Sequence, residues 1–366
     1  MKWRLLLAVL LGLLVGGMAT GSSYIPVQKP IYPAPPQGAL TKVFTGPDAS
    51  LHAHSFVKGK EVTLAINFSA IKDATFIGIA LRPIGNGAYA PAYYVVQGAE
   101  PNDYPRLQRK FEEFAETHFR TQVSNIKIAS AIEPNVNWNY AGSIDWVTST
   151  SSLFGQKGVL ELKGFYYYYP IDSNTIEYYA KTRVRGDVSS SDVALKDLRL
   201  RVSTGGTYEA LEDFLPDGHM GPMTSYSEAI TVELDSEKTA QISASAGYSV
   251  NTNDGYYFRM DTHTLDPNNY VDFHAYDFKK DVPWLPDPPA FGMPFFFESA
   301  VTMKVKSPTN NACYFGIFNY DASAEFYVIN TWLLGMPVTF PPYLVTAPKD
   351  IKISVFVYPP HTVFHS

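Results

Sequence analysis

The chain has 366 residues, of which 46% are hydrophobic and 17% are charged, and its formal net charge is −6. This charge excludes a general nucleic-acid binder, which needs a basic surface to neutralise phosphates. The charged fraction lies below the roughly 25% that is usual in soluble domains, and 25 tyrosines, 23 phenylalanines and 27 prolines make up the difference. Since aromatic residues favour strands, the composition predicts a mainly β protein with a large core.

The N-terminus has the pattern of an export signal. Lys2 and Arg4 precede a run over residues 5–15 that is apolar apart from Gly12, and small residues follow it. We interpret residues 1–21 as a cleaved secretory signal peptide, because the run is shorter than the about 20 residues that a membrane-spanning helix needs. A retained N-terminal anchor is the alternative. No second apolar span follows, so we expect a secreted or cell-surface protein without a transmembrane segment after cleavage.

Residues 22–48 are interpreted as a proline-rich spacer. Five prolines fall between positions 26 and 36, and proline cannot donate a hydrogen bond inside a sheet. Such a stretch favours an extended polyproline conformation, which can hold a folded part away from a membrane or a partner. A poorly ordered tail is the alternative.

Cys313 is the single cysteine, so no disulfide can form within the chain. Exported eukaryotic domains often carry several disulfides, and their absence is typical of a bacterial or archaeal protein stabilised by its core. Cys313 lies between apolar residues, and we expect it to be a buried, unreactive thiol.

Strand patterns dominate the rest of the chain. Period-two alternation, or a short apolar run bounded by glycine and proline, marks many segments. These segments are 61–71, 74–84, 88–98, 159–170, 174–186, 197–203, 229–235, 239–250, 256–264, 270–278, 295–306, 313–320, 325–332 and 351–359. Many short strands with turn residues between them predict antiparallel β-sandwiches of the jelly-roll or immunoglobulin-like kind.

Residues 104–120 are the one strongly predicted helix. Four apolar residues and one histidine form a single helical stripe, made of Leu107, Phe111, Phe114, Ala115 and His118. A shorter helix is predicted at 207–215, ended by Pro216. Because the segment around it is rich in glycine and proline, we place a domain boundary there, with one β-rich domain at 49–204 and a second at 205–366; a single large sandwich is the alternative.

A repeated Asp-x-His marks the most specific candidate site. Asp261–His263 and Asp272–His274 lie on either side of residues 266–269, Asp-Pro-Asn-Asn, which are strong turn formers. A four-residue hairpin loop there places His263 opposite Asp272 and Asp261 opposite His274. The same register puts the apolar side chains on the other face, namely Phe258, Met260, Val271, Phe273 and Ala275.

Two interpretations of this hairpin remain open. Two imidazoles and two carboxylates with Cβ atoms about 5 Å apart could ligate a divalent metal such as zinc or act as an acid–base group. The alternative is a pair of His–Asp contacts on a solvated sheet, worth about 0.2–1 kcal/mol each. The second arrangement is the commoner one, and no other cofactor is expected.

The residues that follow the hairpin suggest a ligand site. Tyr276 lies on the polar hairpin face, and Asp277 and Asp281 come next, close to Trp284. Aromatic rings can stack on a sugar ring, and carboxylates accept hydrogen bonds from its hydroxyls. A rigid proline-containing loop with a buried tryptophan is the alternative.

Three other patterns are less specific. His52 and His54 share one face of a predicted strand and could bind a metal, with exposed surface histidines as the commoner alternative. Phe165–Tyr169 is a dense aromatic run that suits packing between domains. Asn67-Phe68-Ser69 is the single N-glycosylation sequon, although we expect it to lie late in a strand with Phe68 buried. The dinucleotide, P-loop, zinc-protease and serine-hydrolase motifs are absent from the sequence.

Two functions follow as hypotheses. The first is a structural, assembly or surface-binding protein of the cell envelope, whose partners are a glycan or other envelope proteins; for assembly, the strand at 351–359 could complete a neighbour's sheet. The second is a secreted hydrolase of polysaccharide or peptide that uses the His/Asp hairpin. The hydrolase requires a concave pocket in which at least two of the candidate side chains meet.

Overall fold

The computed structural model describes the chain from residue 35 to residue 359, with gaps. The described ranges are 35–120, 127–128, 136–149, 158–188, 190–205, 209–216, 219–223, 229–234, 240–245, 256–265, 270–280, 289–306, 315–329 and 343–359. The predicted signal peptide, Cys313, Asp281 and Trp284 lie outside them.

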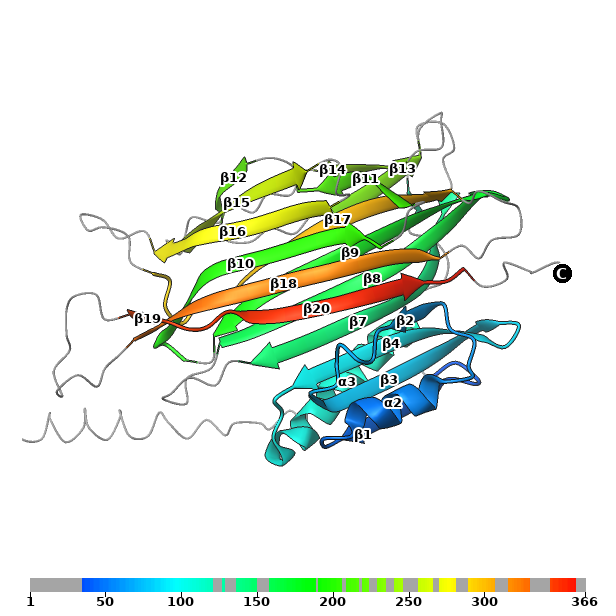
Figure 1. Cartoon of the computed structure of the whole chain (residues 1–366), viewed down its shortest axis with the longest axis horizontal. Helices are drawn as coiled ribbons and strands as arrows, with labels where there is room; N and C mark the ends of the chain where they lie inside the picture. The colour runs from blue at the N-terminus through cyan, green and yellow to red at the C-terminus, as the bar shows by residue number, and fades with distance from the viewer. Residues whose placement is uncertain are drawn as a thin grey trace, which may run out of the picture. The chain divides into compact units, whose positions relative to one another are not determined.

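Two large sheets form the protein (Figure 1). Sheet A has the strand order β1 (Leu40–Thr45), β3 (Ala74–Gly85), β4 (Ala88–Gln97), β7 (Asn139–Ser149), β8 (Gly158–Asp172), β9 (Thr175–Val188), β17 (Phe295–Lys306) and β11 (Glu209–Leu215). Sheet B has the order β12 (His219–Met223), β15 (Tyr256–Leu265), β16 (Tyr270–Lys280), β10 (Val193–Thr204), β18 (Gly316–Ile329), β20 (Lys349–Val357) and β2 (Leu64–Ile66), and β19 (Tyr343–Val345) also pairs with β18.

Smaller elements complete the described chain. Two short pairs lie outside the large sheets, β5 (Lys127–Ile128) with β6 (Val136–Asn137) and β13 (Ala229–Leu234) with β14 (Ala240–Ser245). The helices are α2 (Ala49–Val57), the 3-10 turn η1 (Pro101–Asp103) and α3 (Tyr104–Arg120). Within the described residues, no helix combines the length and the apolar character that crossing a bilayer requires.

The core lies between the two sheets. Alternate residues of β18 are buried, which is the pattern of a strand with one face inward. Tyr166 of sheet A contacts Phe318 and Tyr320 of sheet B, with ring centroids 5.9 and 6.2 Å apart. Both sheets draw strands from either side of residue 205, where the sequence suggested a domain boundary. The predicted mainly β class is confirmed.

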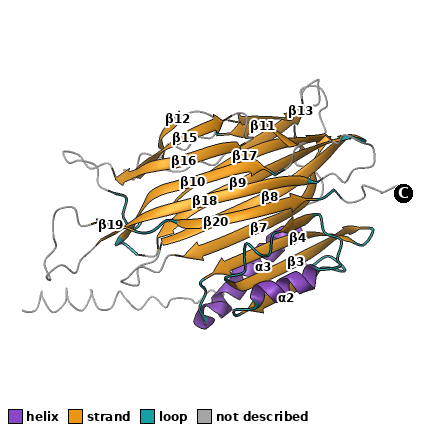
Figure 2. Ribbon diagram, viewed as in Figure 1, coloured by secondary structure: helices purple, strands orange, loops and turns teal. Residues whose placement is uncertain are grey.

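The two helices cover opposite faces of β3 at one end of the protein (Figure 2). The predicted stripe of α3 is buried, and it packs on the outward residues Phe76 and Tyr94 of sheet A. Ala49, Ala53 and Val57 of α2 join the main core with the inward residues of β3. The helix at 104–120 is therefore confirmed.

Two local predictions are wrong. Residues 49–57 form α2 rather than a strand, and Ala49, Ala53 and Val57 at a spacing of four residues are the helical signal that the strand interpretation passed over. Residues 209–215 form β11 rather than a helix. The pairing of β11 with β17 overrides helix propensity there, and buried Glu209 accepts backbone N–H groups from Gly205 and Ile317 at 2.7 and 3.0 Å.

Candidate functional site

The His/Asp hairpin has the register that the sequence predicted. Asp261 pairs with His274 and His263 pairs with Asp272 across β15 and β16. The apolar partners on the other face are buried: Phe258, Met260, Val271, Phe273 and Ala275. The register and the division of the two faces are therefore confirmed.

A third strand supplies partners for this polar face. Arg201 of β10 donates to Asp272, Nη2 to Oδ2, at 2.8 Å, and Asp197 of β10 lies 2.6 Å from Nε2 of His274. Asp272 thus has a cationic neighbour on β10 and His274 has a carboxylate neighbour there, and exposed pairs of this kind contribute about 0–1 kcal/mol each. Among the residues that the structure describes, no group of three or more His, Cys, Asp or Glu side chains is placed to hold a metal ion.

The predicted ligand residues lie at one end of the same hairpin. Asp277 has a positive φ of 60° and forms ion pairs with Arg259 at 3.3 Å and with Lys279 at 2.6 Å. Tyr276 is hydrogen-bonded to Asp261. These contacts hold the two residues against the sheet, and their proposed ligand role rests on the sequence pattern.

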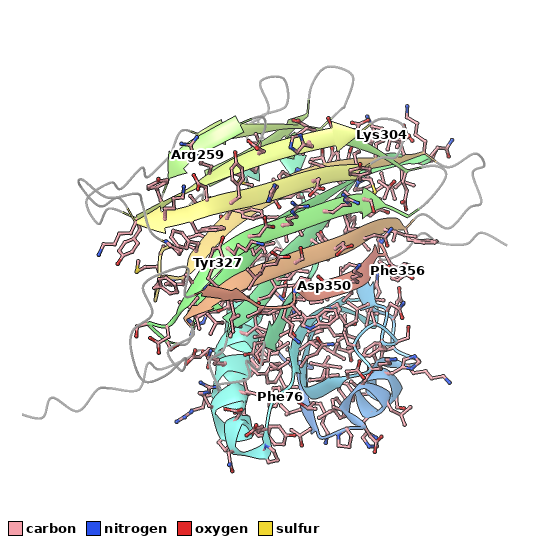
Figure 3. All side chains as sticks on the ribbon, turned by 60° about the vertical axis from the view of Figure 1, so that its left-hand side comes forward. Phe76, Arg259, Lys304, Tyr327, Asp350 and Phe356 are labelled. Carbon is pink, nitrogen blue, oxygen red and sulfur yellow. The ribbon has the colours of Figure 1, made fainter. Side chains whose placement is uncertain are left out.

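The groove beside α2 is the concave site that sequence reasoning missed. It has a volume of about 690 Å³ and lies between α2, the turn after β2 and the end of β20. Its lining is Pro47, Asp48, Ser50, Leu51, His54, Ile66, Asn67, Phe68, Ser69, Lys72 and Phe356. Figure 3 shows Phe356 at the end of β20, near the part of the chain that carries α2. We call this hollow the α2 groove.

Aromatic side chains dominate one part of the α2 groove. The His54 ring stacks on Phe68 with a centroid distance of 5.2 Å and an interplanar angle of 22°. Phe68 in turn meets Tyr93 edge-on at 6.1 Å, and Ser50 donates its hydroxyl to the Phe68 carbonyl at 3.0 Å. Leu51 is 63% exposed beside them. The groove therefore offers a fixed apolar surface that is open to solvent.

Polar side chains surround that apolar surface. Asp48 and Lys72 bring one charge of each sign, and Asn67 and Ser69 are exposed on the turn after β2. Carboxylate and amide oxygens accept hydrogen bonds, while ammonium and amide nitrogens donate them. The arrangement can therefore bind a ligand that has both an apolar face and several hydroxyl groups.

One residue of the α2 groove, His54, was already a candidate from the sequence. It was predicted together with His52 as a pair on one face of a strand. In α2 the two positions lie about 200° apart around the helix axis, so they do not form a chelating pair. The remaining groove residues come from segments far apart in the chain, which only the fold brings together.

A second hollow lies between α3 and the outer face of sheet A. It has a volume of about 380 Å³, and its lining includes Asp145, Glu161, Lys163 and Arg185. Burial raises the pKa of Asp145 to about 7, helped by the charge of Glu161 and opposed by Lys163. The Asp145 and Lys163 charges are 3.8 Å apart, which is an ion pair without a hydrogen bond. Perturbed carboxylates can mark functional sites or structural ion networks, and the alternating charges here are typical of a network.

Glu177, Lys304 and Glu212 form a more deeply buried cluster on the same sheet. Lys304 Nζ lies 3.0 Å from Glu177 Oε1 and 2.8 Å from Glu212 Oε1. Glu177 is fully buried. Burial and, second, the negative charge of Glu212 raise the pKa of Glu177 to about 8. The two carboxylates share one ammonium group, so the cluster favours a proton on Glu177.

Glu177→Gln is expected to make folding stability less sensitive to a rise in pH from 4.5 to 8. The pKa of Glu177 rises from 4.5 in a free glutamate to about 8 in the folded chain, so its contribution to stability is complete below pH 4.5 and is lost as pH rises through 8. One pKa unit corresponds to about 1.4 kcal/mol. Urea unfolding at a series of pH values between 5 and 9 measures how the free energy of unfolding changes with pH.

Glu298→Gln is the matched control, because Glu298 also pairs with a lysine, Lys181 at 2.8 Å, in a more exposed position. An equal slope in wild type and Glu177→Gln would contradict the expectation.

Comparisons with known proteins give no family. No family model and no curated protein matches the sequence. Among solved structures, the fold is similar to Clostridium perfringens delta-toxin with a TM-score of 0.31, 9% identity, and coverage of 62% of this chain and 92% of that one. A structure described as a pore forming protein has a TM-score of 0.30, 10% identity, and coverage of 62% and 97%.

A third similar structure is the collagen-binding domain from a Staphylococcus aureus adhesin. Its TM-score is 0.19, its identity is 10%, and the match covers 51% of this chain and 95% of that domain. At such low identity and TM-score these likenesses carry no argument about what the chain does. The chain itself forms a mainly β protein built from two sheets that pack face to face.

Proposed function

We propose that the protein is an exported β-sandwich protein of the cell surface that binds a glycan in the α2 groove. One observation carries this proposal: the α2 groove, with a volume of about 690 Å³, places aromatic rings beside hydrogen-bonding side chains in an open position. Concave sites with an apolar surface and a few polar groups are the usual place for small ligands.

The chemistry of the α2 groove suits a sugar ring. Phe356 and the stacked pair His54–Phe68 offer flat faces to the C–H groups of a pyranose. Asp48 can accept hydrogen bonds from its hydroxyl groups, and Lys72 can donate to them. The Ser50 hydroxyl holds the Phe68 backbone in place before a ligand arrives. Binding therefore costs little conformational entropy in this segment, which favours affinity.

The same contacts favour binding over hydrolysis. A serine nucleophile has to pass its proton to a base. In the groove, Ser50 donates to the Phe68 carbonyl at 3.0 Å and Ser69 donates to the Asn67 side chain at 2.6 Å. Both hydroxyl protons are therefore directed away from His54. The hydrolase hypothesis also needs the hairpin carboxylates in a pocket, whereas other residues line the two hollows described above.

Strand exchange between copies has less support. The strand that we considered for it is β20, which pairs with β18 on one side and with β2 on the other. Its edge toward β18 is paired from Lys349 to Val357, and its other edge is paired with β2 at Val355–Val357. The predicted export signal at 1–21 agrees with a role outside the cytoplasmic membrane. The predicted spacer at 22–48 is shorter than the sequence suggested, because residues 40–45 form strand β1 of sheet A.

Binding to a glycan array, followed by calorimetry with the strongest ligand, tests this function. We expect Phe356→Ala to weaken binding about tenfold, because an aromatic contact is worth about 0.5–1.5 kcal/mol beyond its buried area. Tyr276→Ala is the matched control, since it removes an aromatic ring from the hairpin face predicted from the sequence.

The outcomes separate the sites. Loss of binding in Phe356→Ala with wild-type affinity in Tyr276→Ala supports the α2 groove. The reverse result would place the ligand on the hairpin, and the absence of binding to any glycan by the folded wild-type protein would overturn the proposal.

A further inference from the structure

Asn67 lies in a different setting from the one that its sequence suggested. Strand β2 ends at Ile66, and Asn67 is the first residue of the turn that follows. Asn67 and Ser69 are exposed, while Phe68 between them is half-buried against Tyr93. The sequon therefore lies on a surface turn, which is where an acceptor asparagine has to be.

The turn presents its two functional side chains together. The Asn67 side-chain oxygen accepts hydrogen bonds from the Ser69 backbone N–H at 3.0 Å and from the Ser69 hydroxyl at 2.6 Å. This local bonding is an Asx-turn, in which an asparagine side chain bonds two residues further along the chain. The carboxamide and the hydroxyl, the two groups that define a sequon, are thus adjacent and accessible to an enzyme.

The backbone of this segment is anchored independently of the Asn67 side chain. Asn67 N donates to the Ser354 carbonyl at 3.3 Å, and Ala70 N donates to the Asn67 carbonyl at 3.0 Å. Phe68 supplies the apolar contact to the core. A group attached to the exposed amide nitrogen would therefore leave these anchoring contacts in place.

We propose that Asn67 is an acceptor site for an N-linked oligosaccharide. The donor is an oligosaccharide joined to a lipid through a diphosphate. Nδ2 of Asn67 attacks the anomeric carbon of the first sugar, so a C–N bond forms. The bond between that carbon and the diphosphate oxygen breaks, the electron pair leaves with the lipid diphosphate, and a base of the transferase takes the amide proton.

Expression of the full chain in a eukaryotic secretory cell line tests this site. We expect the secreted protein to carry a glycan on the peptide that contains Asn67, and an amide-cleaving glycosidase to release it and leave aspartate at position 67. Peptide mass spectrometry before and after the enzyme reads both changes. The measurement is independent of whether the α2 groove binds a ligand, so the two proposals can fail separately.

Four variants make the test specific. Asn67→Gln and Ser69→Ala are expected to abolish the modification, whereas Ser69→Thr, which keeps the hydroxyl, retains it. Asn174→Gln is the control, because Asn174 also lies in a turn but has Ile176 instead of a hydroxyl residue two positions on. Equal secretion and melting temperature of the variants show that they fold. An unmodified Asn67 peptide in the secreted wild type, or a glycan that persists in Ser69→Ala, would overturn the proposal.

Discussion

Acidification from pH 6.5 to pH 3 is expected to lower the stability of the folded protein by on the order of 4 kcal/mol through His118 alone. Burial, and to a lesser extent the positive charge of Arg82, lower the pKa of His118 from 6.5 to about 3. A histidine with a lowered folded pKa contributes stability that is present above its unfolded pKa and is lost as pH falls toward the folded value. The fold therefore has to break the His118 contacts, or unfold, to bind that proton.

The contacts of His118 explain why it stays neutral. Its Nε2 lies 2.9 Å from the Ala90 carbonyl, which can only accept, so Nε2 carries the hydrogen. Its Nδ1 then accepts the Tyr140 hydroxyl hydrogen at 2.8 Å. Both ring nitrogens are thus used inside the protein, where His118 is 1% exposed and joins α3 to sheet A.

His118→Leu provides the test of this titration. At pH 7 we expect a loss of about 2–4 kcal/mol, because the Tyr140 hydroxyl and the Ala90 carbonyl lose their partner. Between pH 6.5 and 4, however, the variant should lose less stability than the wild type does. Guanidinium unfolding at a series of pH values measures both effects, with exposed His52→Asn as the control. An acid slope that is the same in wild type and His118→Leu would refute the assignment.

Gly142→Ala is expected to destabilise the fold by about 3 kcal/mol or more. Gly142 has a φ of +152°, and a Cβ atom there would lie 2.5 Å from the Pro91 carbonyl oxygen and 3.0 Å from Leu64. Overpacking costs about 1–3 kcal/mol, and a conformation that L-residues avoid adds about 1–2 kcal/mol. The obstacle is backbone of the adjacent strand β4, so a side-chain rotation cannot relieve it.

A second glycine, Gly46, separates the cost of the steric contact from the cost of the backbone conformation. Gly46 has a φ of +90° and nothing within 4 Å of an added Cβ. Gly46→Ala should therefore show only the conformational cost, about 1 kcal/mol. Thermal and urea unfolding of both variants measure the difference. Equal losses in the two variants would show that the contact with Pro91 is relieved and that the packing argument is wrong.

The register of the β15–β16 hairpin could be predicted from the local sequence pattern. Alternation of apolar and polar residues around a four-residue turn was sufficient to predict the pairing of Asp261 with His274 and of His263 with Asp272. A strand has a period of two, so a slip of one residue would have put the whole apolar set into solvent. The stripe of α3 was predictable for a similar reason, because its four apolar residues and His118 recur at the helical period and so lie on one face of the helix.

The partners of that hairpin were beyond the sequence pattern. Arg201 and Asp272 are 71 residues apart, yet they lie 2.8 Å from each other because β10 pairs with β16. The α2 groove likewise combines Leu51 and His54 with Phe356, and Glu177 meets Lys304 across two strands that are distant in the chain. Such contacts depend on strand order, and strand order is set by the packing of whole sheets.

The amino-acid sequence by itself determined the mainly β class, the α3 helix, the register of the hairpin and the presence of one sequon, because each follows from periodicity or from neighbours along the chain. The tertiary structure alone decided that residues 209–215 are extended, which side chains line the α2 groove, and that Asn67 begins a turn. Burial and long-range pairing carry the free energy that settles those points, and both arise only when distant segments pack together.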